Sequence, residues 1–203
     1  MSQLASEQRP GEPDWSTKPT LTGTLVELRP FREADLAGIG EALTDPEVLR
    51  LTGWAHSSQE ILDGPRALDE RGLEWYRTRN DASDRLDLAI VDRSTSACVG
   101  EAVLNDYDAG NCSCNFRILI GPAGRDRGLG TEATRLIVDY GLQVLGLHRI
   151  ELSVFAFNPR ALHVYEAAGF RREGVRRDAF RFDGQWIDDI LMSILATDRA
   201  PAA

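Results

Sequence analysis

The stretch Arg125-Asp126-Arg127-Gly128-Leu129-Gly130-Thr131-Glu132-Ala133 carries the strongest structural signal in the chain, because it joins a glycine-containing loop to a periodic helix. Residues 116–120 upstream are predicted to form an apolar strand, and apolar residues recur at helical spacing over 133–144. The loop therefore precedes a helix N-terminus, where free backbone N–H groups and the positive end of the helix dipole face an anion. Gly128 and Gly130 let a ligand approach the backbone without a Cβ in the way. The pattern predicts a site for a pyrophosphate.

Two other kinds of phosphate loop fit this stretch less well. A Walker loop needs a lysine before its final Ser or Thr, but Gly130 precedes Thr131 and the only lysine of the chain is Lys18. A dinucleotide fingerprint needs a third glycine, and Ala133 stands at that position. Taken alone, the motif also remains compatible with a loop that merely caps its helix.

A second motif follows the strand predicted over 149–155. It runs Asn158-Pro159-Arg160-Ala161-Leu162-His163-Val164-Tyr165-Glu166-Ala167-Ala168-Gly169-Phe170. Asn158 is a favourable N-cap, Pro159 suits the first helical position, and Gly169 suits the left-handed residue that ends a helix. Asn158 and Tyr165 are two turns apart, roughly 10 Å along the axis, so we expect both on the same side of the helix.

With these two motifs in register, the chain resembles the GCN5-related N-acetyltransferase (GNAT) superfamily. In that family an Arg/Gln-x-x-Gly-x-Gly/Ala loop holds the pyrophosphate of acetyl-CoA, and an Asn-x-x-Ala-x-x-x-Tyr-x-x-x-Gly-Phe helix flanks the pantetheine arm. The matching residues here are Arg125, Gly128 and Gly130 in the loop, and Asn158, Ala161, Tyr165, Gly169 and Phe170 in the helix. Residues 25–35 and 183–195 resemble the bacterial-like subgroup that acetylates ribosomal-protein N-termini, which also includes antibiotic and small-amine acetyltransferases.

The resemblance implies an α/β (α+β) GNAT fold. We expect a central mixed, mostly antiparallel, twisted sheet of about seven strands flanked by helices, with acetyl-CoA in the cleft between the strands near 112–120 and 148–155. The patterns predict strands near 24–30, 86–91, 97–104, 112–120, 148–155, 171–181 and 186–196. They predict helices near 32–43, 129–144 and 159–168, and a helical region over 58–79 that Gly64-Pro65 interrupts. Residues 1–20 contain three prolines and no period, so we predict a mobile tail there and one domain over 21–198.

Composition narrows the class of protein. A chain of 203 residues suits one domain, and it contains neither a run of about 20 apolar residues nor a signal peptide, so we expect a cytoplasmic protein without a membrane partner. Three cysteines and three scattered histidines predict neither a disulfide framework nor a metal site. The formal charge of −9 argues against nucleic acid and favours a cationic partner. A homodimer stays open.

The chemistry of acetyl transfer assigns roles to particular residues. The resemblance implies direct attack of a neutral amine on acetyl-CoA in a ternary complex, with Tyr165 as the acid for the departing thiolate and backbone N–H groups near Leu119 for the oxyanion. The alternative for Tyr165 is a packing role. The expected donor-binding residues are Ile118, Leu119, Ile120, Arg125, Asp126, Arg127, Gly128, Leu129, Gly130, Thr131, Asn158, Arg160 and Tyr165.

The sequence does not identify a clear general base. Many relatives carry a glutamate on the strand before the phosphate loop, but residues 112–115 contain no carboxylate. Glu101 and Asp106 are candidates, directly or through water, and Ser153 is a candidate for binding the amine or relaying a proton. Ordinary structural roles for all three, and attack by amine that is already neutral, remain alternatives.

The acceptor is the least determined part of the prediction. We expect a protein or peptide N-terminus, ahead of a small amine such as an antibiotic or polyamine. Because the base is missing, a non-catalytic acyl-CoA-binding regulatory module is a third alternative.

Overall fold

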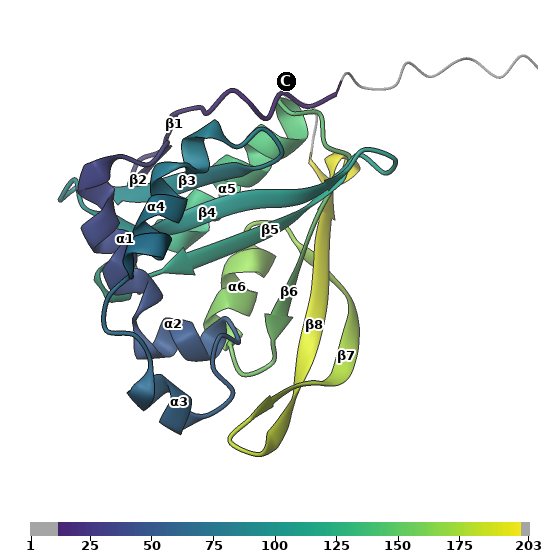
Figure 1. Ribbon diagram of the computed structural model, residues 1–203. Coiled ribbons are helices and arrows are strands. Elements are labelled where there is room, and N and C mark those ends of the chain that lie inside the picture. Colours follow the sequence, from purple (N-terminus) through teal and green to yellow (C-terminus); the bar gives the residue numbers. More distant parts are fainter. Residues whose placement is uncertain (1–11, 200–203) are drawn as a thin grey trace, which may run out of the picture.

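A computed structural model describes residues 12–199 and has an eight-stranded sheet with the order β1-β2-β3-β4-β5-β6-β8-β7 (Figure 1). The strands are β1 (Leu21–Thr22), β2 (Val26–Arg29), β3 (Leu86–Asp92), β4 (Cys98–Asp108), β5 (Ser113–Ile120), β6 (Arg149–Phe155), β7 (Arg171–Phe182) and β8 (Gln185–Leu195). The α-helices are α1 (Leu36–Leu43), α2 (Pro46–Leu51), α3 (Ser58–Asp63), α4 (Glu70–Arg77), α5 (Leu129–Gln143) and α6 (Pro159–Ala167). This arrangement confirms the predicted fold class.

One strand pair differs from all the others in the sheet. β5 and β6 run parallel, and their pairing covers only Ser113–Asn115 against Arg149–Glu151. The remaining neighbours are antiparallel, and apart from the short β1–β2 pair they pair over longer stretches, for example Gly100–Asp108 of β4 against β5. Beyond Asn115 the two parallel strands therefore separate, and Figure 1 shows them diverging toward the end that carries α2. The splay leaves a gap in the middle of the sheet.

Helices cover the two faces of the sheet unequally. On one face α5 and α6 enclose the larger core, whose fully buried side chains include Phe116, Leu129 and Ile137. Phe116 of β5 stacks on Phe170 and meets Tyr165 edge-on, so the floor of the splay is filled by aromatic rings. A smaller core on the opposite face packs α1 and α4 against β3 and β4. Strands β6, β8 and β7 form the other end of the sheet, beyond this smaller core.

The long β7–β8 hairpin reaches back to the segment between α2 and α3. The Asp183 amide donates to the His56 carbonyl at 3.0 Å, and the Ser58 amide donates to the Asp183 carboxylate at 2.8 Å. The His56 ring also packs on Phe180, with the ring centroids 4.8 Å apart. Segments about 125 residues apart in the sequence thus form one wall at the splayed end of the sheet.

Most of the expected elements are confirmed, with three differences. The two-residue strand β1 was not predicted, and it makes the sheet eight-stranded instead of seven-stranded. Helix α2 was not predicted, because its six residues are too few for an apolar period, although Asp45 caps it and Pro46 occupies its first turn. Residues 12–20 lie on the domain instead of forming part of a tail: Trp15 is buried against Tyr107, and Lys18 donates to three backbone carbonyls. The rest of the predicted tail, residues 1–11, lies outside the described residues. Within 12–199 no helix is long and apolar enough to cross a membrane.

Candidate active site

A cleft of about 500 Å³ occupies the gap between β5 and β6. Its walls come from both splayed strands, the N-terminus of α5, the inner side of α6, helix α2 and one residue of β8. The lining includes Val48, Leu51, Thr52, Phe116, Arg117, Ile118, Leu119, Ile120, Gly124, Arg125, Asp126, Gly128, Gly130, Thr131, Ser153, Val154, Phe155, Asn158, Arg160, Ala161, His163, Val164, Tyr165 and Asp189. We call the part at residues 124–131 the donor end and the part at Ser153, Phe155 and Asp189 the acceptor end.

The donor end is formed by the start of α5. Gly128 is the N-cap of this helix with a φ of +78°, a conformation that strains residues with a Cβ, and no side chain caps the helix. Helices α2, α3, α4 and α6 each have a side-chain oxygen on a first-turn amide. The amides of the first turn of α5 therefore face the cleft with room for an anion, which is what a pyrophosphate requires.

The arginines of the predicted loop are already bound by carboxylates of the chain. Arg125 pairs with Asp45 and, at 2.7 Å, with Glu47, both at the N-terminus of α2. Arg160 of α6 reaches the same Glu47 at 2.8 Å. Arg127 pairs with Asp92 at 2.6 Å and does not line the cleft. The donor end is thus mainly a backbone cradle with neutralised arginines around it.

Leu129 and Asp126 complete the predicted loop, and they point in opposite directions. Leu129 is buried in the core and does not line the cleft, whereas Asp126 is exposed at the rim. Of the residues predicted to hold the donor, all except Arg127 and Leu129 line the cleft.

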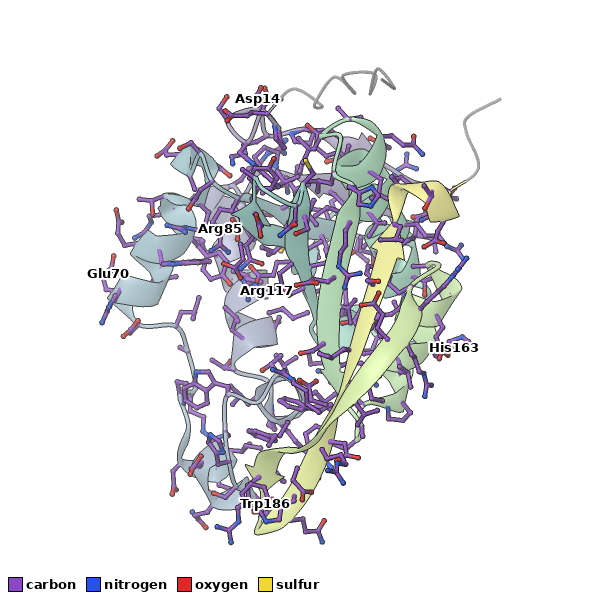
Figure 2. The ribbon with its side chains drawn as sticks, turned by 90° about the vertical axis from the view of Figure 1, so that its right-hand side faces the viewer. Asp14, Glu70, Arg85, Arg117, His163 and Trp186 are labelled. Atoms are coloured by element: carbon purple, nitrogen blue, oxygen red, sulfur yellow. The ribbon has the colours of Figure 1, made fainter. Side chains whose placement is uncertain are left out.

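Helix α6 presents its predicted pair to the cleft. Asn158 caps the helix, its side-chain oxygen accepting from the Ala161 amide at 3.1 Å, and Tyr165 follows two turns later. Tyr165 is buried between Phe116 and Phe170, and this burial raises the pKa of its hydroxyl well above its usual range. The phenol is therefore a neutral proton donor throughout the physiological pH range. His163 is exposed at the outer rim, where Figure 2 shows it projecting from α6.

Glu101 lies beneath the cleft without lining it. Its carboxylate is fully buried in the layer between β4 and α4, where it accepts from the Tyr76 hydroxyl at 3.0 Å. Arg117, whose side chain is 43% exposed, pairs with it at 2.9 Å and is the member of this group that lines the cleft (Figure 2). Burial raises the pKa of Glu101, and the positive charge of Arg117 opposes that rise.

The other two candidates for proton transfer lie at opposite ends of the sheet. Ser153 lines the acceptor end on the exposed side of β6. Asp106 is exposed in an irregular part of β4, near the closed end where β5 and β6 are still paired, and it does not line the cleft. Ser153 and Tyr165 therefore both line the cleft, whereas Asp106 does not.

Sequence reasoning missed several residues that line the acceptor end. Leu51 ends the unpredicted helix α2 and Thr52 is its C-cap. Phe155 stacks on Phe180 with their ring centroids 4.6 Å apart. Asp189 is buried in β8 and lines the cleft from the far strand. In the sequence it is the second of two adjacent aspartates, and strand alternation was the signal that one of them points inward. Among residues 12–199 no group of three potential ligands could hold a metal ion.

Comparison with known proteins agrees with this geometry. The sequence pattern of the family described as "Acetyltransferase (GNAT) domain" matches residues 26–171. The chain is 29% identical to spermidine N(1)-acetyltransferase of Escherichia coli, over 83% of this chain and 85% of that protein. It is also 29% identical to the [ribosomal protein uS5]-alanine N-acetyltransferase of Escherichia coli, over 55% of this chain and 58% of that protein.

Solved structures share the fold. Spermidine N-acetyltransferase from Vibrio cholerae, solved in complex with CoA and spermine, superimposes with a TM-score of 0.71 at 23% identity. The superposition covers 87% of this chain and 98% of that protein. A GNAT-family acetyltransferase from Bacillus anthracis gives a TM-score of 0.72 at 19% identity and covers 88% and 99% of the two chains.

Proposed function

The chain belongs to the GNAT acetyltransferase family and is an acetyl-CoA-dependent N-acetyltransferase; we propose that its acceptor is a small cationic amine of the polyamine kind. The match to spermidine N(1)-acetyltransferase spans most of both chains, while the match to the ribosomal-protein enzyme spans little more than half of each. This difference reverses the order of acceptors that the sequence motifs favoured.

The β7–β8 turn is joined to the α2–α3 segment beside the acceptor end, where His56 packs on Phe180 and Phe180 on Phe155, and this observation carries the proposal. The hydrogen bonds from Asp183 to His56 and from Ser58 to Asp183 join the β7–β8 turn to the α2–α3 segment. A protein N-terminus would have to enter past these joined segments with its polypeptide still attached. A small amine needs no such exit. The formal charge of −9 also favours a cation.

On the donor side, backbone groups do most of the binding. The first-turn amides of α5 and the glycines at 128 and 130 face the pyrophosphate of acetyl-CoA, which supplies an activated acetyl group as a thioester. Beyond Asn115, alternate backbone N–H groups of β5 have no partner on β6. Those near Leu119 are placed to stabilise the oxyanion that forms when the amine attacks.

On the acceptor side, the amine must lose a proton before it attacks. Glu101 is sealed beneath Tyr76 and Arg117, so it does not reach the amine directly. Ser153 is the candidate that faces the acceptor, and a hydroxyl is a weak base on its own. We therefore favour capture of the neutral fraction of the amine, with Ser153 orienting its lone pair.

Tyr165 completes the reaction by protonating the thiolate. Its hydroxyl has no hydrogen-bond partner among the described residues, and its raised pKa keeps the proton on it at neutral pH. A thiolate is a weaker base than a phenolate, so the phenol gives up its proton only if another proton replaces it. Amine attack forms the C–N bond, the C–S bond breaks and the phenol proton goes to sulfur, while the proton that the attacking nitrogen loses returns to the phenolate directly or through water.

The test is a competition between acceptor classes. Purified full-length enzyme is assayed for CoA release with spermidine, with butylamine, and with an alanine-initiated peptide at the same pH. We expect kcat/KM to be at least about tenfold higher for spermidine than for the peptide, the size of one additional charge contact. A higher kcat/KM for the peptide would overturn the proposal and restore the N-terminal acceptor.

A further inference from the structure

Asp189 is a buried carboxylate at the acceptor end, and the proposed acetyl transfer does not use it. Asp189 of β8 lies directly opposite Phe155 of β6, so both side chains are on the same face of the sheet. This is the face away from α5 and α6, onto which Ser153 also points. Asp189 is 1% exposed and lines the cleft.

Only one of the two carboxylate oxygens of Asp189 has a hydrogen-bond or salt-bridge partner among the described residues. Oδ2 pairs with Arg176 of β7, whose side chain is 60% exposed. Oδ1 is buried and has no hydrogen-bond partner among the described residues. Burying a charged group with an unsatisfied oxygen is unfavourable unless a partner arrives. The free oxygen therefore indicates a missing cationic or hydrogen-bonding group.

The cations that line the cleft do not supply this partner. Arg117 is held by Glu101, and Arg125 and Arg160 are held at the N-terminus of α2. At the acceptor end the unsatisfied charge is thus negative.

The position of Asp189 suits a second cationic group of the acceptor, separated from the nitrogen that reacts. Ser153 of β6 pairs with Leu191 of β8, and Asp189 is two residues from Leu191. The backbone of Asp189 is therefore displaced from that of Ser153 by about 7 Å along the strand and by about 4.8 Å across to the neighbouring strand. A nitrogen that attacks near Ser153 is therefore separated from Asp189 by a distance that an aliphatic diamine spans. A monoamine would leave the carboxylate without a partner.

We propose that Asp189 binds the second ammonium group of the acceptor and thereby selects di- and polyamines over monoamines. The proposal rests on the proposed function, because it identifies what distinguishes the acceptor within the class of small amines. Arg176 tunes the site: it neutralises part of the carboxylate in the empty enzyme and competes with the ammonium for it.

The experiment compares kcat/KM for spermidine and butylamine in full-length wild type and Asp189→Asn. We expect the variant to lose about 10- to 150-fold on spermidine, the range for a hydrogen bond to a charged group, and to change little on butylamine. Asp188→Asn is the matched control. It removes the same charge from the residue that precedes Asp189 in β8. The Asp188 carboxylate lies on the opposite face of the strand and accepts from the Asp178 amide. We expect it to leave the ratio of the two kcat/KM values unchanged.

A second variant keeps the test decisive if Asp189→Asn unfolds. Arg176→Gln removes the competing cation from a side chain that is largely exposed. If Asp189 binds the acceptor, KM for spermidine should fall by about two- to fivefold. If the Asp189–Arg176 pair is only structural, KM should stay constant or activity on both amines should fall together.

The possible outcomes separate this inference from the proposed function. Wild-type activity on spermidine with no selective loss in Asp189→Asn overturns the role of Asp189 and leaves the acceptor class intact. An equal loss on both amines also overturns it. Wild-type activity on the peptide alone overturns the acceptor class, and the proposal for Asp189 falls with it.

Discussion

The two ends of the cleft present different chemical groups, so we expect them to recognise their ligands by different means. At the donor end the groups that face the ligand are the amides of an uncapped helix and two glycines, and the neighbouring arginines are already paired. At the acceptor end the groups are side chains: Tyr165, Ser153 and Asp189. Donor binding should therefore fail when a Cβ enters the backbone cradle. Acceptor binding and turnover should depend on single side-chain atoms.

The largest effect should follow from removing one oxygen atom near the thioester. Tyr165→Phe should lower kcat by about 10²- to 10⁴-fold, the usual contribution of one general acid, and leave acetyl-CoA affinity nearly unchanged. The measurement is single-turnover kinetics together with calorimetry. Tyr140→Phe is the control, since Tyr140 is a partly buried tyrosine of α5 that does not line the cleft. Near-normal turnover in Tyr165→Phe would assign this residue to packing alone.

The pH dependence of kcat/KM should follow the pKa of the acceptor amine and not the pKa of a protein group. If the enzyme captures neutral amine, kcat/KM should rise about tenfold per pH unit up to the pKa of the acceptor, near 10.4 for a lysine-type amine. Glu101→Gln should leave the inflection where it is, because Glu101 is sealed below the cleft. An inflection well below the amine pKa that disappears in Glu101→Gln, Asp106→Asn or Ser153→Ala would instead identify a general base.

At the donor end, adding a Cβ at a glycine should change acetyl-CoA affinity more than removing a charged side chain nearby. Gly128→Val should weaken acetyl-CoA binding at least about tenfold, because it fills the cradle in front of the first-turn amides. Gly184→Val is a control of equal strain: its φ is +81°, and it lies in the β7–β8 turn with nothing within 4 Å. Both variants should lose about 1–2 kcal/mol of stability from the left-handed backbone. Equal acetyl-CoA affinities for the two variants in calorimetry would contradict the backbone cradle.

The smallest effect should come from a carboxylate that holds two arginines. Glu47→Gln frees Arg160 and leaves Arg125 paired with Asp45 alone, so more positive charge is available to the phosphates and acetyl-CoA should bind about two- to fivefold more tightly at low salt. Glu41→Gln on the exposed side of α1 removes the same charge from a residue with no hydrogen-bond or salt-bridge partner among the described residues, and it should change little. Weaker binding in Glu47→Gln would mean that α2 must hold the arginines in place for the donor.

The same contrast explains which parts of the site were predictable. The donor end lies within one continuous segment, so glycine spacing, a helix period and a cap signal were enough to predict the loop at Arg125–Thr131. Helix α6 was equally local, from the Asn158 cap to the turn at Gly169. The fold class followed because both motifs belong to a recognisable pattern.

The acceptor end could not be predicted in the same way, because long-range pairing builds it. The contact of Ser58 with Asp183 beside the acceptor end spans 125 residues. Burial of Glu101 beneath Tyr76 depends on how α4 lies on the sheet, which no local pattern encodes. Trp15 was assigned to a tail for the same reason, since its partner Tyr107 is distant in the sequence.

The most direct test of the contrast is a crystal structure of the wild-type enzyme with CoA and spermidine. The predicted result has three parts: the pyrophosphate within hydrogen-bond distance of the amides of residues 128–131, the sulfur beside the Tyr165 hydroxyl, and an ammonium nitrogen on Oδ1 of Asp189. Phosphates held by the side chains of Arg125 and Arg160 with those amides unliganded, or spermidine bound away from the gap between β5 and β6, would contradict it.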